Sequence, residues 1–179
     1  MSLDTRWEDV DKLLTTTERT KDEKHQKAVR EIAAQRFPFP TPEHPSYRTH
    51  VNTPQVTMGV QAGDDELAPD IVVVERLNTG ETNLRMTTQV ALVHEINEAE
   101  AKRTWARFSA IPDQAFYLYV PVGQGAAAKK ICQRLKIRPA GFRTWRMTPR
   151  GLEVNEISEA PSPLAVLMPP LVRRLLATP

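Results

Sequence analysis

Hydrophobic residues recur at helical spacing in two stretches near the N-terminus. Residues 4–14 and residues 21–36 each place apolar side chains three and four positions apart, a pattern typical of amphipathic helices. His25 is predicted to lie on the exposed side of the second helix. Prolines between residues 37 and 50 exclude a helix there, so this stretch is expected to be extended or irregular.

The next part of the chain carries the patterns of β-strands. Residues 51–60 alternate weakly between polar and apolar side chains and predict a strand, whereas the polar residues 61–67 predict a loop. Ile71–Val74 is a continuous apolar run of the kind found where both faces of a strand are covered. The turn signal Asn78-Thr79-Gly80 separates it from an expected strand over residues 85–93, so the two strands should form a hairpin.

Helical and strand patterns alternate through the second half. The expected elements are a helix over residues 98–108 with Asn97 as its N-cap, a strand over 115–120, a helix over 125–135, and two short strands over 142–147 and 152–157. This order predicts an α/β fold in which a mixed β-sheet is flanked by helices.

The chain divides into three expected parts. Residues 1–20 form an N-terminal helical extension, residues 21–158 a core domain, and residues 159–179 an apolar C-terminal tail. Pro169-Pro170 interrupts the tail, which therefore cannot be one straight helix. An exposed apolar tail would be adhesive, so we expect it to pack on the domain or on a second copy, and a homodimer is the expected assembly.

Composition excludes several classes of protein. No stretch approaches the roughly 18 consecutive apolar residues of a membrane span, and acids and Trp7 occupy the N-terminus where a signal peptide would be apolar. Cys132 is the only cysteine, which excludes an internal disulfide and a multi-cysteine zinc site. The sequence predicts a cytoplasmic protein without a membrane partner, with Cys132 as a core thiol.

Charge is distributed unevenly, although the net charge is only +2. No acidic residue occurs between Asp113 and Glu153, a stretch with eight basic residues. Segregation of this kind favours a basic face that meets a polyanion. The expected nucleic-acid contacts are Lys129, Lys130, Arg134, Arg143, Arg146 and Arg150. The alternative is a set of solvated charges on a helix and a hairpin.

Four segments together carry a family resemblance. They are PDIVVVE (residues 69–75), the apolar run from Met86, EAEAKRTW (residues 98–105) and FYLYVP (residues 116–121). In these segments the chain resembles the restriction-endonuclease-like PD-(D/E)xK nuclease fold, and more specifically an uncharacterised prokaryotic branch of it, over about residues 22–145.

The resemblance implies where a catalytic site would lie. In that family two central strands present an Asp, then an acid-x-Lys, to one or two magnesium ions, which activate water for attack on a phosphodiester. Asp70 takes the first position, Gln89 stands where the second acid is expected, and Ala91 stands where the Lys is expected. Strand alternation puts Gln89 and Ala91 on one side, where both should face Asp70.

These replacements predict a degenerate nuclease. Gln89 brings no charge to a cation, and Ala91 offers neither a donor nor a charge. The resemblance therefore predicts a nucleic-acid-binding or structural, assembly role, with no catalysis and no cofactor. One alternative is an active magnesium-dependent DNA endonuclease that uses Asp70 with a displaced acid such as Glu95. In another, Asp70 only accepts hydrogen bonds from backbone amides.

Two further motifs leave alternatives open. Gly123-Gln124-Gly125 follows a strong strand and opens a helix, as in dinucleotide-binding folds, but no acid follows about 20 residues later to hold a ribose. The motif is therefore either a nucleotide-cofactor site or a simple turn. Trp145 lies among arginines and either stacks on bases or packs in the core.

Overall fold

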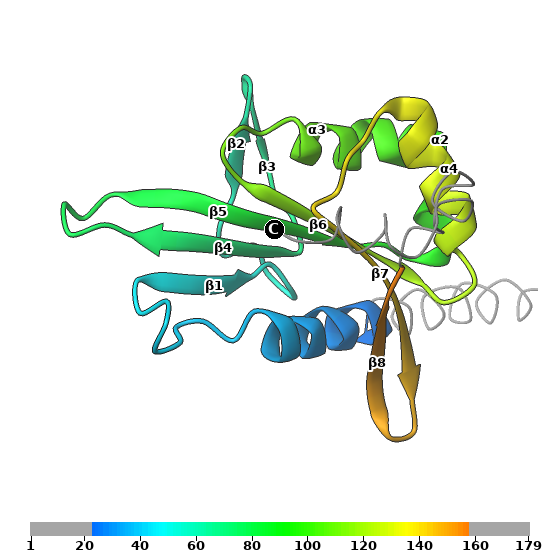
Figure 1. Ribbon diagram of the computed structural model, residues 1–179, viewed down its shortest axis with the longest axis horizontal. Helices are drawn as coiled ribbons and strands as arrows, with labels where there is room; N and C mark the ends of the chain where they lie inside the picture. Colours follow the sequence, from blue (N-terminus) through cyan, green and yellow to red (C-terminus); the bar gives the residue numbers. More distant parts are fainter. Residues whose placement is uncertain (1–22, 158–179) are drawn as a thin grey trace, which may run out of the picture.

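Six strands form one curled, mixed sheet in the computed structural model, which describes residues 23–157 (Figure 1). In order across the sheet they are β1 (Tyr47–Val51), β4 (Ile71–Arg76), β5 (Thr82–Val90), β6 (Ala115–Pro121), β7 (Gly141–Thr148) and β8 (Gly151–Glu156). β1, β4 and β5 are antiparallel, β6 and β7 run parallel to β5, and β8 returns antiparallel to β7. The predicted mixed α/β class is confirmed. The expected helix of residues 4–14 and the tail of residues 159–179 lie outside the described residues.

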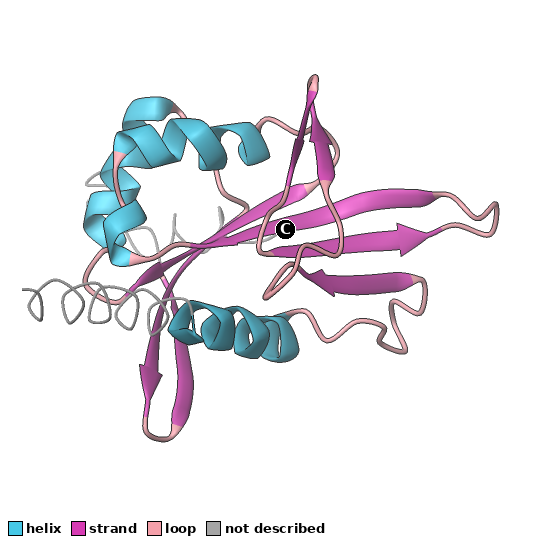
Figure 2. Cartoon of the chain, turned by 180° about the vertical axis from the view of Figure 1, so that it is seen from behind, coloured by secondary structure: helices cyan, strands magenta, loops and turns pink. Residues whose placement is uncertain are grey.

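Helices cover both faces of this sheet (Figures 1 and 2). The helix of residues 23–36 lies on one face, where Val29 and Ile32 join a buried cluster with Ile71 and Val73 of β4. Helices α2 (Glu98–Glu100), α3 (Ala106–Ser109) and α4 (Gly125–Leu135) cover the other face, toward which β4 turns Val72 and Val74. Burial on both faces explains why β4 reads as an unbroken apolar run.

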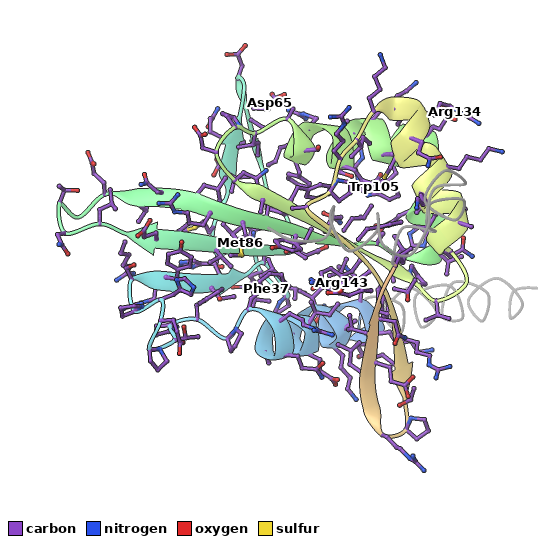
Figure 3. All side chains as sticks on the ribbon, in the orientation of Figure 1. Phe37, Asp65, Met86, Trp105, Arg134 and Arg143 are labelled. Atoms are coloured by element: carbon purple, nitrogen blue, oxygen red, sulfur yellow. The ribbon has the colours of Figure 1, made fainter. Side chains whose placement is uncertain are left out.

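The predicted helix of residues 98–108 is built from three consecutive pieces. Asn97 caps its start by accepting a hydrogen bond from the Glu100 amide at 2.9 Å, as the sequence predicts. A five-residue π-helical segment, Ala101–Trp105, then joins α2 to α3. Trp105 points from this segment toward the sheet (Figure 3) and is fully buried.

Residues 51–67 differ from the sequence-based expectation. The predicted strand over residues 51–60 is wrong, because β1 ends at Val51 and the side chain of Asn52 organises a loop. Its amide donates to the Met58 and Pro69 carbonyls, and its oxygen accepts from the Thr57 and Met58 amides. An asparagine that bonds to its neighbours' backbone in this way competes with strand formation.

The predicted loop over residues 61–67 is also wrong. It contains the small hairpin of β2 (Val60–Ala62) and β3 (Asp65–Leu67), joined through Gly63, whose φ of +69° suits glycine. An ion pair between Asp65 and Arg107 ties the hairpin to α3. Leu67 and Met58 pack at the edge of the core cluster on the α2–α4 face.

Gly141 begins β7 where the ring of Tyr117 crosses it. A β-carbon added at Gly141 would lie 2.5 Å from Cδ1 of that ring. We expect Gly141→Ala to lower the free energy of unfolding by about 1–3 kcal/mol, since the ring must move out of its packing. Urea unfolding measures this loss. In a Tyr117→Ala background the same change should be close to neutral, and an equal loss in both backgrounds would contradict a steric cause.

None of the helices among residues 23–157 has the length and apolar composition needed to cross a bilayer.

Candidate functional site

Asp70 lies immediately before β4 and is 9% exposed. Its Oδ2 atom accepts a hydrogen bond from the backbone amide of Val90, the last residue of β5, at 2.7 Å. The carboxylate therefore joins the start of one central strand to the end of its neighbour. The sequence left open whether Asp70 binds a metal or accepts hydrogen bonds from backbone amides. The contact with the Val90 amide corresponds to the second alternative.

His25 approaches the same point from the helix of residues 23–36. Its Nε2 atom lies 2.9 Å from the Val90 carbonyl oxygen and 3.4 Å from Oδ1 of Asp70. The prediction that His25 lies on the exposed side of its helix is wrong, because its side chain is only 21% exposed. The Nε2–H group donates to the Val90 carbonyl and lies within ion-pair distance of the Asp70 carboxylate, so His25 connects its helix to both central strands.

Electrostatics favour a positive charge on His25. Burial lowers the pKa of His25, but the hydrogen bond and charge of Asp70, the Val90 carbonyl and the charge of Glu95 raise it, and the net pKa lies above the ordinary 6.5. Burial also raises the pKa of the Glu95 carboxyl, against the opposing effects of the Leu92 amide and of His25, and the charge of Asp70 adds to the rise. Asp70, His25 and Glu95 therefore influence one another.

Gln89 and Ala91 lie beside this pair without joining it. Alternation from Val90, which packs toward the helix of residues 23–36, places Gln89 and Ala91 on the α2–α4 face. Ala91 is fully buried in the core cluster there, and Gln89 is half-buried opposite Leu118 of β6. The Asp70 carboxylate instead contacts the Val90 amide and His25.

The residues around Asp70 do not fit a magnesium ion. One carboxylate oxygen of Asp70 accepts a hydrogen bond from the Val90 amide, and the other lies 3.4 Å from Nε2 of His25. Glu95 accepts from the Leu92 amide at 2.7 Å. Among residues 23–157, no three His, Cys, Asp or Glu side chains are grouped to hold a metal.

A pocket of about 440 Å³ lies nearby. Its lining residues are Lys24, Leu92, Val93, His94, Trp145 and Met147. Trp145, whose role the sequence left open, is buried and donates its indole N–H to the Ala91 carbonyl at 3.2 Å. Neither Asp70 nor His25 lines this pocket.

Three of the six predicted nucleic-acid contacts are engaged by glutamates. Arg134 pairs with Glu98, Arg146 with Glu153, and Arg143 with Glu156. Arg143 is also drawn inward: it donates to the Tyr119 hydroxyl at 2.9 Å, and its guanidinium lies over the rings of Tyr117 and Tyr119. Figure 3 shows Arg134 on the outer side of α4.

Four of the remaining cations lie in α4 and in the connection that follows it. Lys129 and Lys130 belong to α4, and Lys136 and Arg138 follow in the connection to β7. Within residues 23–157 none of these four has an ion-pair partner. Arg150 is exposed in the β7–β8 turn, away from α4 (Figure 1). The sequence prediction omitted Lys136 and Arg138, although both lie in the same acid-free stretch.

The Gly123–Gly125 turn has a packing role in the structure. Gly123 has a φ of +88°, which favours glycine at the turn before α4. A β-carbon on Gly125 would lie 2.9 Å from Cδ1 of Ile157 and 3.4 Å from Cγ2 of Thr144. The small residue therefore lets the start of α4 approach β7 and the residue after β8 closely.

Comparisons of the chain with protein-family models, with curated proteins and with solved structures gave no match.

Proposed function

We propose that this chain is a non-enzymatic nucleic-acid-binding domain built on a restriction-endonuclease-like scaffold. The observation that carries the proposal is the group of four cations at α4 and the following connection, which have no carboxylate partner within residues 23–157. Lys129, Lys136 and Arg138 all border one pocket, so their charges converge on one surface. Converging, unneutralised cations attract phosphates and release the counterions condensed on the nucleic acid.

The arrangement at Asp70 supports the non-enzymatic part of the proposal. The two strands that would carry a catalytic set are neighbours, β4 and β5, with Asp70 before the first and Gln89 in the second. Asp70 is engaged by the Val90 amide and His25, and Gln89 brings no charge. Asp70, at the position where a nuclease would bind its metal, therefore connects β4 to the end of β5 and to the helix of residues 23–36.

The salt dependence of binding to labelled duplex and single-stranded DNA tests the nucleic-acid-binding part of the proposal. We expect Lys130→Gln/Arg138→Gln to weaken binding to all sequences. For duplex DNA the slope of log affinity against log salt should fall by about 2, because each removed cation leaves one phosphate with its counterions. Both side chains are exposed, so the fold should be unaffected.

The matched control is Lys27→Gln/Arg30→Gln. It removes the same charge from the exposed side of the helix of residues 23–36, which covers the opposite face of the sheet. We expect the control to keep the wild-type salt slope. Equal loss in both variants, or no binding by the wild type at low salt, would contradict the proposed surface.

Incubation of plasmid DNA with the protein and magnesium or manganese tests the non-enzymatic part of the proposal. We expect no cleavage by the wild type above that of a matched preparation of Asp70→Asn. Cleavage by the wild type that is lost in folded Asp70→Asn would show that Asp70 acts with a displaced acid such as Glu95, and would overturn the non-enzymatic proposal.

A further inference from the structure

A pocket of about 640 Å³ lies between α4 and the start of β7. Its apolar wall is formed by Cys132, Ile137, Phe142 and Ile157. Cys132 is 5% exposed, and burial raises the pKa of its thiol to about 11, so it acts as an apolar group here. The volume is in the range of sites that hold an organic ligand or several side chains.

The rim of the same pocket is positively charged. Lys129, Lys136 and Arg138 border it, and within residues 23–157 no acid forms an ion pair with any of them. The pocket therefore suits an occupant that combines an anionic group with apolar groups.

Ile157 marks the point where the described chain ends, and it lies in the wall of the pocket. Its amide donates to the Phe142 carbonyl at 3.0 Å, and Cδ1 of its side chain fills the space above Gly125. The described part of the chain therefore ends at the pocket.

The sequence that follows has the two properties that the pocket requires. Glu159 is the only acidic residue among residues 158–179, and it comes two positions after Ile157. The apolar run Leu164–Met168 follows after two prolines, which reduce the conformational entropy that a segment loses on docking. If it were exposed to solvent, such an apolar run would favour nonspecific association.

We propose that the segment after Ile157 occupies this pocket of its own chain, with Glu159 against the cationic rim and Leu164 against the apolar wall. Attachment at Ile157 supplies the segment at an effective concentration in the millimolar range, so it is favoured over a free ligand of the same chemistry. The proposal does not depend on nucleic-acid binding. It implies that Glu159 and phosphates compete for Lys129, Lys136 and Arg138.

Disulfide trapping in the full-length chain tests this docking, because Cys132 is the only cysteine. Leu164→Cys and Ala177→Cys place a second thiol seven and twenty residues after Ile157. The rate of intramolecular disulfide formation with oxidised glutathione is followed by mass spectrometry. A free tether, with its −3/2 power dependence on length, would make the nearer position only about five-fold faster. We expect a docked segment to make it at least about 50-fold faster.

Charge reversal supplies the specific control. Glu159→Lys in the Leu164→Cys chain should slow cross-linking about ten-fold, Lys136→Glu should do the same, and the two changes together should restore most of the rate. Asp64→Lys, which alters the net charge equally at the exposed β2–β3 turn, should have no effect.

Three results would overturn the proposal. The first is a ratio of about five between the two cysteine positions, and the second is a Glu159→Lys change that leaves the cross-linking rate of the Leu164→Cys chain unaltered. The third is a disulfide that forms only between two chains, which would assign the pocket to the tail of a second copy. DNA binding is not a readout here, so failure of the nucleic-acid proposal leaves this test intact.

Discussion

Replacing Trp105 by alanine is expected to lower the free energy of unfolding by about 3–5 kcal/mol, the usual cost of deleting a large aromatic side chain from a core. Trp105 is fully buried in the cluster between the sheet and the α2–α4 layer. It ends the π-helical segment, so its ring also fixes how α3 meets the sheet. Urea unfolding followed by circular dichroism measures the loss.

Trp105→Phe is the matched control. The indole N–H is buried and has no hydrogen-bond partner within residues 23–157. Phenylalanine keeps most of the ring packing and removes this unpaired donor, so we expect a loss below about 1.5 kcal/mol. A loss as large as that of Trp105→Ala would mean that the indole N–H is satisfied and that burial of the ring is not the main contribution.

Replacing Asp70 by alanine is expected to cost about 3 kcal/mol, because the Val90 amide and His25 lose a charged acceptor in a buried position. The loss should be accompanied by a change in pH dependence. The folded pKa of His25 is raised above 6.5, so its protonation stabilises the fold below pH 6.5. That stability is lost as the pH rises through the folded pKa.

Asp70→Asn isolates this electrostatic part. Without the carboxylate, burial is the dominant influence left on His25 and lowers its pKa. We therefore expect the free energy of unfolding to fall with pH around neutrality in the wild type and to rise with pH in Asp70→Asn. His25→Gln should remove the His25 contribution from both slopes and leave the rise with pH that the lowered pKa of His50 contributes. Unfolding curves between pH 5.5 and 8.5 test this, a range from roughly one unit below to two units above an ordinary histidine pKa. Identical slopes of the free energy of unfolding against pH in the wild type and in Asp70→Asn would disprove the coupling.

Much of the fold could be predicted from local patterns. The β4–β5 hairpin, β6, α4 and the β7–β8 hairpin all follow from hydrophobic period and turn residues. The predictions for residues 51–67 were wrong because side-chain hydrogen bonds and a tight turn, and not the alternation of polar and apolar residues, determine the structure there. The Asn52 side chain organises its loop through hydrogen bonds to four backbone groups. The short β2–β3 hairpin could have been predicted only from its Gly63-Asp64 turn.

The site was less accessible from the sequence than the fold. Asp70 could be singled out because it precedes an apolar strand, but its partner His25 lies 45 positions earlier on a different element. No local pattern reports which carboxylate a helical histidine will meet across a fold. Likewise, an acid-free stretch does not exclude ion pairs, because Glu98 comes from α2 and Glu153 and Glu156 from β8.

The helix of residues 23–36 also constrains the order in which the chain can assemble. Glu31 accepts a hydrogen bond from the Leu152 amide, 121 positions later, and Arg36 reaches the Val154 carbonyl across 118 positions. Contacts of such high sequence separation close late and slow folding. During synthesis, the apolar stripe of this helix can pack on β4 early, but its cluster is completed only when Trp145 of β7 and Leu152 of β8 emerge. We therefore expect the nascent chain to depend on chaperones until β8 has been made.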